Sequence, residues 1–176
     1  MNRAVFLDRD GVINRVNLRE GRPFAPRSLD DLEFLPDVGQ AIDAMRQAGF
    51  LMIIVTNQPD VASGITPLAV VEAMHGRIKD TFQIDDIKVC YHRDEDACSC
   101  RKPKPGMILE AEKDWTLDLS CSFLVGDRWR DIGAGRAAGC RTILIDGGYN
   151  EQKAKDPDAV VGSLLEASTL ILTDRV

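Results

Sequence analysis

In the run Val5-Phe6-Leu7-Asp8-Arg9-Asp10-Gly11-Val12, two carboxylates come directly after a short apolar stretch. Such a stretch is typical of a strand buried on both faces, so Asp8 and Asp10 are expected at a strand's carboxyl end. Ligands of open α/β sheets bind outside the carboxyl ends of the strands. An Asp there can act as a covalent nucleophile toward phosphorus, although Asp-Gly after a strand is also a common turn. The run therefore marks a candidate catalytic edge.

The rest of the chain alternates between strand-like and helix-like patterns. Apolar runs rich in β-branched residues recur at 51–55, 87–89, 122–125 and 142–145. Helical patterns cover 38–48, 107–114, 131–138, and a stretch that Thr66 caps and that runs to about Phe82. Strands that alternate with helices of this length predict βαβ units, and hence a parallel sheet with helices on both faces.

Composition narrows the class of protein. With 176 residues, 44% of them hydrophobic, the chain fits one domain over residues 1–176 whose core needs no disulfides. The net charge of −6 argues against nucleic-acid binding, which relies on Lys and Arg to neutralise phosphates. No apolar run approaches the roughly 18 residues of a membrane span, and no signal-peptide pattern follows Met1. We expect a cytoplasmic monomer with neither membrane nor nucleic-acid partners.

Four metal-ligand side chains fall within eleven residues, namely Cys90, His92, Cys98 and Cys100. Three thiolates and an imidazole make the tetrahedral set of a closed structural zinc site, with no position left for a catalytic water. The alternative is a loop that carries thiols by coincidence. We expect structural Zn²⁺ here, ordering the loop so that Arg101 and Lys102 are held in place.

Short hydrogen-bonding side chains follow the second expected strand as Thr56-Asn57-Gln58. At the carboxyl end of a strand, these groups could hold a phosphoryl oxygen. They could equally satisfy the backbone of an ordinary turn, as Thr and Asn often do. Sequence leaves both interpretations open.

Two more carboxylates, Asp127 and Asp131, follow the fourth expected strand. Parallel strands end at one edge of a sheet, so these residues join Asp8 and Asp10 in an acidic cluster. Clustered carboxylates repel one another unless a cation neutralises them, and oxygen ligands favour a hard ion such as Mg²⁺. Asp131 could also cap the helix that follows, or orient the metal ligands from behind.

The order of these motifs resembles the haloacid dehalogenase superfamily of phosphatases. That order is the Asp8 start, the Thr56 turn, the Lys102-Pro103 step and the Gly126-Asp127 turn. The longer strings at 6–14, 55–58 and 98–107 are similar to its zinc-containing branch of heptose bisphosphate phosphatases and histidinol phosphatases. The resemblance implies a Rossmann-like, doubly wound α/β sheet with a minimal cap, closed by the zinc-stapled loop over a small phosphorylated molecule.

The resemblance also implies an activity. This is Mg²⁺-dependent hydrolysis of a phosphomonoester through an aspartyl-phosphate intermediate. The implied substrate is D-glycero-D-manno-heptose 1,7-bisphosphate, which is hydrolysed to the 1-phosphate in nucleotide-heptose synthesis. Histidinol phosphate is the alternative substrate. A non-catalytic zinc-stapled module that binds phosphorylated metabolites is the alternative class, but binding alone needs neither a nucleophile nor a general acid.

Carried over residue by residue, the resemblance implies that Asp8 attacks phosphorus and that Asp10 protonates the leaving oxygen and then activates water. Thr56 and Lys102 would hold the transferring oxygens. Mg²⁺ would be bound by the side chains of Asp8 and Asp127 and by the carbonyl of Asp10, with Asp131 orienting the metal shell. Substrate contacts are expected from Thr56, Asn57, Gln58, Arg101, Lys102 and Arg128.

The chain departs from heptose bisphosphate phosphatases in two segments. The turn at 59–64 lacks an Arg that those enzymes usually carry. Residues 16–22 take the place of their sugar-contacting segment but have a different sequence. The role of segment 15–36 in specificity is therefore left open.

Overall fold

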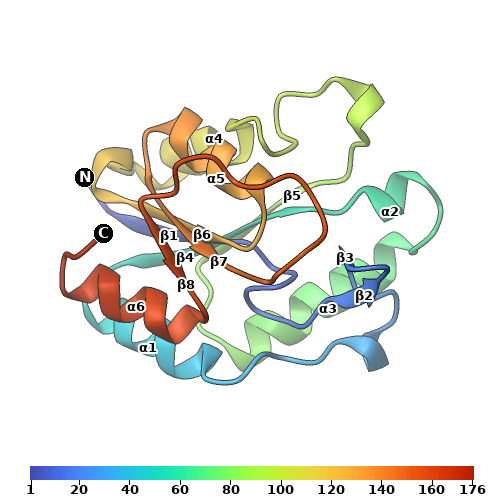
Figure 1. The fold of residues 1–176 in the computed structure, drawn as a ribbon, viewed down its shortest axis with the longest axis horizontal. Coiled ribbons are helices and arrows are strands. Elements are labelled where there is room, and N and C mark those ends of the chain that lie inside the picture. The colour runs from blue at the N-terminus through green and yellow to red at the C-terminus, as the bar shows by residue number, and fades with distance from the viewer.

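Six parallel strands form the central sheet of this protein in a computed structural model that describes residues 1–176. Across the sheet they run β5 (Asp86–Cys90), β4 (Leu51–Asn57), β1 (Ala4–Leu7), β6 (Phe123–Gly126), β7 (Arg141–Ile145) and β8 (Ala159–Val161) (Figure 1). The expected parallel α/β sheet is confirmed.

Helices cover both faces of this sheet, as expected (Figure 1). One face packs against α1 (Val38–Gln47), α3 (Leu68–Thr81) and α6 (Leu164–Leu172), and the other against α4 (Gly106–Trp115) and α5 (Trp129–Ala138). Successive side chains of a strand point to opposite faces. In β1, Val5 and Leu7 accordingly join the first core, while Ala4 and Phe6 join the second.

The strand order creates a crevice at one edge of the sheet. From β1 the chain moves outward to β4 and β5, and then returns to place β6 on the other side of β1. Connections leave β1 and β6 in opposite directions, and such a switch point opens a crevice beyond the strand ends. Asp8 follows β1 and Asp127 follows β6, so the fold brings the two carboxylates to this crevice.

Several elements differ from the sequence-based expectation. Residues 14–36 contain a small antiparallel hairpin, β2 (Asn17–Arg19) and β3 (Arg22–Phe24), and a single helical turn, α2, spans Pro59–Ala62. Thr66 does not cap α3, because Pro67 occupies the cap position and no side chain bonds the helix end. α5 begins at Trp129 rather than at residue 131, and β8 and α6 form where no element was expected. None of the helices combines the length and apolarity that crossing a bilayer requires.

Candidate active site

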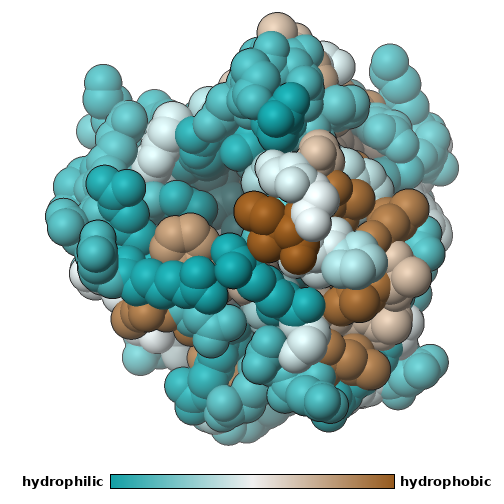
Figure 2. Space-filling view, turned by 90° about the vertical axis from the view of Figure 1, so that its right-hand side faces the viewer, coloured by the Kyte–Doolittle hydropathy of each residue, from teal (hydrophilic) through white to brown (hydrophobic).

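A cavity of about 500 Å³ opens at the carboxyl edge of the sheet. The space-filling view shows it as a hollow surrounded mainly by hydrophilic residues (Figure 2). The volume lies within the range of small-molecule sites. The predicted site residues on its wall are Asp8, Asp10, Asn57, Gln58, Lys102, Asp127, Arg128 and Asp131. Trp129 lies on the wall as well.

Three buried carboxylates converge at the base of this cavity. One oxygen from each of Asp8, Asp127 and Asp131 lies within 4.8 Å of the other two. Burial, together with the charge of Asp131, raises the pKa of Asp8 to about 7. Burial and the charge of Asp8 likewise hold the pKa of Asp127 well above its usual range. The cluster is therefore short of positive charge, and a bound divalent cation would reverse both shifts.

Lys102 is the one protein cation inside this cluster. Its Nζ lies 2.9 Å from Asp8 Oδ1 and 2.5 Å from Asp131 Oδ1, and it donates to the carbonyl of Val55 at 2.7 Å. These three contacts use all three N–H donors of an ammonium group. Burial alone would lower the pKa of Lys102, but the charges of Asp131 and Asp8 raise it. Lys102 is thus a permanently charged, fully anchored group beside Asp8.

Asp127 has one carboxylate oxygen anchored and one without a partner. Tyr149 Oη donates to Oδ2 at 2.7 Å, whereas Oδ1 is buried with no hydrogen bond. An unpaired buried oxygen is costly unless a metal or ordered water completes it. Gly11, with φ of +89°, allows the close packing, because a Cβ there would lie 1.8 Å from Asp127 Oδ2. The donor set fits a hard cation such as Mg²⁺.

Asp131 links the cluster to helix α5. Its Oδ2 accepts the backbone N–H of Arg128 at 3.0 Å, which caps the helix, while its Oδ1 faces Lys102. Asp131 can therefore cap the helix with one oxygen while its other oxygen takes part in the cluster. Gly126 is needed beside it, since a Cβ there would lie 2.2 Å from the Cβ of Asp131.

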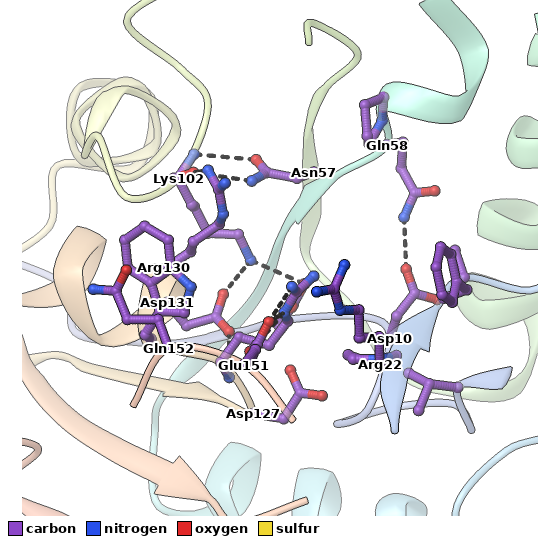
Figure 3. A pocket seen from close by; sticks show the side chains of 18 of the residues that line it. Asp10, Arg22, Asn57, Gln58, Lys102, Asp127, Arg130, Asp131, Glu151 and Gln152 are labelled. Atoms are coloured by element: carbon purple, nitrogen blue, oxygen red, sulfur yellow. Dashed lines mark hydrogen bonds and ion pairs between the residues drawn. The ribbon is translucent and has the colours of Figure 1, made fainter. Parts of the chain in front are cut away.

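Asp10 lies on the cavity wall, held by several donors. Arg9 Nη2 binds both its carboxylate oxygens at 2.9 and 3.0 Å. Asn14 Nδ2 donates to Oδ1 at 2.9 Å, and Gln58 Nε2 donates to Oδ2 at 2.7 Å (Figure 3). The Arg9 side chain is fully buried and also contacts His75 Nε2 at 3.2 Å. Asp10 is thus positioned by a buried network whose members are not themselves at the cluster.

Two predicted substrate contacts lie away from the cavity wall. Thr56 is fully buried, and its hydroxyl accepts a hydrogen bond from Gln58 at 2.9 Å. Arg101 donates to Asp94 Oδ1 at 2.7 Å and to the carbonyl of His92 at 3.2 Å. Neither residue lines the cavity in this structure. Their roles in holding substrate remain predictions.

The four expected zinc ligands come together at the end of β5, which supplies Cys90, and in the loop that follows it. The Sγ atom of Cys100 lies 3.1 Å from that of Cys90, 3.5 Å from that of Cys98 and 3.3 Å from His92 Nδ1. A tetrahedral zinc with ordinary bond lengths would separate such ligands by about 3.5–3.8 Å. The separations of Cys90 Sγ from His92 Nδ1 and from Cys98 Sγ, 3.6 and 3.7 Å, fall in this range, and two of those at Cys100 are a few tenths of an ångström shorter. The donor set therefore suits Zn²⁺, and no disulfide competes for the thiols.

This zinc loop, residues 90–102, connects directly to the cluster. Asn57 fixes its end, because its side chain accepts from the backbone N–H of Lys102 and donates to the backbone carbonyl of Lys102, both at 3.1 Å. The amide of Asn57 therefore binds the backbone of a remote loop rather than that of its own turn, while it also lines the cavity. A rigid loop of this kind delivers Lys102 to its three acceptors.

Sequence reasoning missed three residues that line the cavity, Arg22, Arg130 and Glu151, and Tyr149, which binds Asp127 from behind. Arg22 comes from the hairpin, and Glu151 from the loop after β7 that also carries Tyr149. Arg130 lies between Asp127 and Asp131, but nothing in its spacing distinguishes it from a helix-surface residue. The two loops reach the cavity only through tertiary packing, which no local pattern encodes.

Comparisons with known proteins agree on one group. Residues 99–167 match a family model described as "HAD-hyrolase-like". The chain is 35% identical to the D-glycero-beta-D-manno-heptose-1,7-bisphosphate 7-phosphatase of Pseudomonas aeruginosa, over 99% of this chain and 94% of that protein. It is 36% identical to the enzyme of that name from Rhodopseudomonas palustris, over 82% and 83% of the two chains.

A solved structure gives the same result at the level of the fold. The D,D-heptose 1,7-bisphosphate phosphatase of B. bronchiseptica, complexed with magnesium and phosphate, superposes with a TM-score of 0.81. The sequence identity is 29%, and the alignment covers 98% of this chain and 99% of that one. Magnesium and phosphate are thus bound by a relative with the same architecture.

Proposed function

Because the chain belongs to the haloacid dehalogenase-like phosphatases, we propose that it removes the 7-phosphate of D-glycero-β-D-manno-heptose 1,7-bisphosphate, with Mg²⁺ as the catalytic ion. The observation that carries this proposal is the buried cluster of Asp8, Asp127 and Asp131, with Lys102 beside it and one Asp127 oxygen unpaired. A buried cluster with this excess of negative charge is typical of a site where a divalent cation binds together with an anionic substrate.

Asp8 is the proposed nucleophile. Its Oδ1 accepts from the backbone N–H of Arg9 at 2.7 Å and faces Lys102, whereas Oδ2 has no hydrogen bond to the protein. The carboxylate is therefore fixed by one oxygen, and the other remains available at the cavity. In-line attack on phosphorus would form an aspartyl phosphate and release the sugar oxygen.

Asp10 is the proposed proton carrier. It would protonate the departing oxygen and then accept a proton from the water that hydrolyses the aspartyl phosphate. A group with both tasks must stay at the reacting centre through both steps. The contacts from Arg9, Asn14 and Gln58 support this, because they restrain the carboxylate on the cavity wall.

Mg²⁺, when bound by Asp8, Asp127 and the Asp10 carbonyl, would neutralise the charge that builds up on the transferring oxygens. Lys102 adds a second positive charge from a fixed position, and Asp131 keeps it there. Since phosphoryl transfer depends largely on positioning and charge stabilisation, these groups suffice for the chemistry. Zn²⁺ in the neighbouring loop would have a structural role only.

The test is phosphate release from a panel of substrates with and without Mg²⁺. We expect the β-anomer of heptose 1,7-bisphosphate to have a higher kcat/KM than its α-anomer or histidinol phosphate, and the product to retain the 1-phosphate. A higher kcat/KM for histidinol phosphate would contradict the proposed substrate. If zinc-loaded protein releases no phosphate from any substrate with Mg²⁺, including an aryl phosphate, the result would favour the non-catalytic binding module.

A further inference from the structure

Arg22 reaches the cavity from the hairpin β2–β3. The hairpin turns at Glu20 and Gly21, which have φ values of 52° and 75°, as a two-residue turn of type I′ requires. The backbone N–H of Asn150 donates to the carbonyl of Gly21 at 2.8 Å, so the turn is tied to the loop after β7. Arg22, the first residue of β3, then points into the cavity (Figure 3).

The other three cations on the cavity wall are neutralised by carboxylates. Lys102 is held by Asp8 and Asp131. Arg128 Nε lies 3.0 Å from both oxygens of Glu151, and both Nη atoms of Arg130 bind Asp94, at 2.9 and 3.1 Å. The Arg22 guanidinium has neither an ion pair nor a hydrogen bond. It is therefore the one lining cation without a carboxylate partner.

The hairpin places a second positive charge next to Arg22. Arg19 and Arg22 are paired in register across the two strands, and like charges in directly opposite positions destabilise a strand pair. Arg19 turns to the ring of Phe24, with its guanidinium 5.3 Å from the ring centroid, and it does not line the cavity. An anion beside Arg22 would relieve this repulsion.

We propose that Arg22 is a specificity-determining residue that binds a second phosphate group of the substrate, at the end remote from the scissile phosphate. This inference rests on the proposed function, since it takes the scissile phosphate to lie at Asp8. Both residues line the cavity, but Arg22 is exposed whereas Asp8 is buried. A guanidinium can bind phosphate through two parallel N–H donors. The ligand class is a sugar that carries two phosphate esters.

The experiment compares two substrates that share the same scissile bond. These are D-glycero-β-D-manno-heptose 1,7-bisphosphate and the corresponding 7-phosphate, which lacks the distal group. We expect Arg22→Gln to lower kcat/KM for the bisphosphate by about tenfold or more, mainly through KM, because a charge-assisted contact is lost. Turnover of the 7-phosphate and of p-nitrophenyl phosphate should be unchanged. Arg19→Gln is the matched control, since it removes the same charge from the same hairpin.

Several outcomes would overturn the inference. Equal losses on both sugar substrates would show that Arg22 does not read the distal phosphate. If Arg19→Gln and Arg22→Gln lower kcat/KM for the bisphosphate equally, the hairpin would act through its overall positive charge rather than through a contact from Arg22. If wild-type protein hydrolyses aryl phosphate but Arg22→Gln keeps the wild-type preference for the bisphosphate over the 7-phosphate, this inference fails while the proposed function stands. If wild-type protein hydrolyses no phosphate ester with Mg²⁺, the proposed function fails together with it.

Discussion

At the scale of single residues, Arg9 has the most unusual environment, because its long cationic side chain is fully buried. A buried charge is tolerated only when paired and hydrogen-bonded. Asp10 supplies the charge, and His75 faces the remaining edge of the guanidinium with Nε2. Burial, with Arg9 adjacent, lowers the pKa of His75 to about 4, and Asp10 and Lys79 are the other charges that act on it. His75 is therefore neutral in the working enzyme.

This pairing predicts a pH-dependent stability. In the unfolded chain His75 has a pKa near 6.5, so between about pH 6.5 and 4 the unfolded state binds more protons than the folded one. The contribution of His75 is fully present above pH 6.5 and is lost as the pH falls. Between pH 7.5 and 5, wild-type protein should lose about 2 kcal/mol of unfolding free energy relative to His75→Gln.

Denaturant unfolding of both proteins at these two pH values measures the effect directly. The Gln variant keeps a neutral side chain beside Arg9 but cannot titrate, so the other groups cancel in the difference. Parallel pH curves for the two proteins would show that His75 is not held neutral against Arg9.

At the scale of elements, the zinc loop is the one segment whose order is expected to depend on a metal. Its ligands run from Cys90, the last residue of β5, to Cys100, and its last residue is Lys102. We predict about one zinc per chain by elemental analysis of protein prepared without chelator. Cys98→Ser should lower zinc content and, in excess Mg²⁺, reduce kcat at least tenfold, because Lys102 loses its fixed position.

Cys121→Ser serves as the control for this prediction, since Cys121 is exposed and is not one of the four expected zinc ligands. It should retain both zinc and activity. Full activity of zinc-free Cys98→Ser protein would contradict a link between the metal and Lys102.

The elements also show which features the sequence could predict. β1 and β4 were readable because buried parallel strands are continuous apolar runs. The hairpin was not, since each of its strands has only three residues and most of these are exposed, and a contact from the distant Asn150 ties down its turn. α6 carried a readable signal, because Ser163 caps the helix by accepting from the N–H of Glu166, the spacing of a capping box.

At the scale of the whole molecule, the cluster couples metal binding to stability. Three buried carboxylates repel one another, and Lys102 offsets only part of their charge. Wild-type protein should therefore gain stability with Mg²⁺, by about 2.7 kcal/mol at a hundredfold excess over Kd. For a chain of this length that corresponds to roughly 5–10 °C in Tm.

Asp127→Asn should remove most of this response and all but trace activity. Without Mg²⁺ its Tm should equal or exceed that of wild-type protein, because one buried charge is gone while Tyr149 can still donate to residue 127. Thermal unfolding in Mg²⁺-free and Mg²⁺-saturated buffer checks both parts. A wild-type Tm that ignores Mg²⁺ would contradict the assignment of the cluster to the metal.

The same scale explains what the sequence could reveal of the site. Asp8, Asp127 and Lys102 were predictable because each follows a strand or a metal loop with a recognisable pattern. Arg22, Tyr149 and Glu151 lie on segments without periodicity, and only the packing of two loops over the sheet edge brings them together. The floor of the cavity is thus encoded by local sequence patterns, whereas its rim forms only when the whole chain is folded.

The most direct measurement is a crystal structure of the protein with Mg²⁺ and beryllofluoride, a mimic of a phosphoryl group bound to a carboxylate. We predict beryllium bonded to a side-chain oxygen of Asp8, with Mg²⁺ between Asp8 and Asp127. Density for the mimic on Asp10, or only at the zinc loop, would contradict the assignment of Asp8 as the nucleophile.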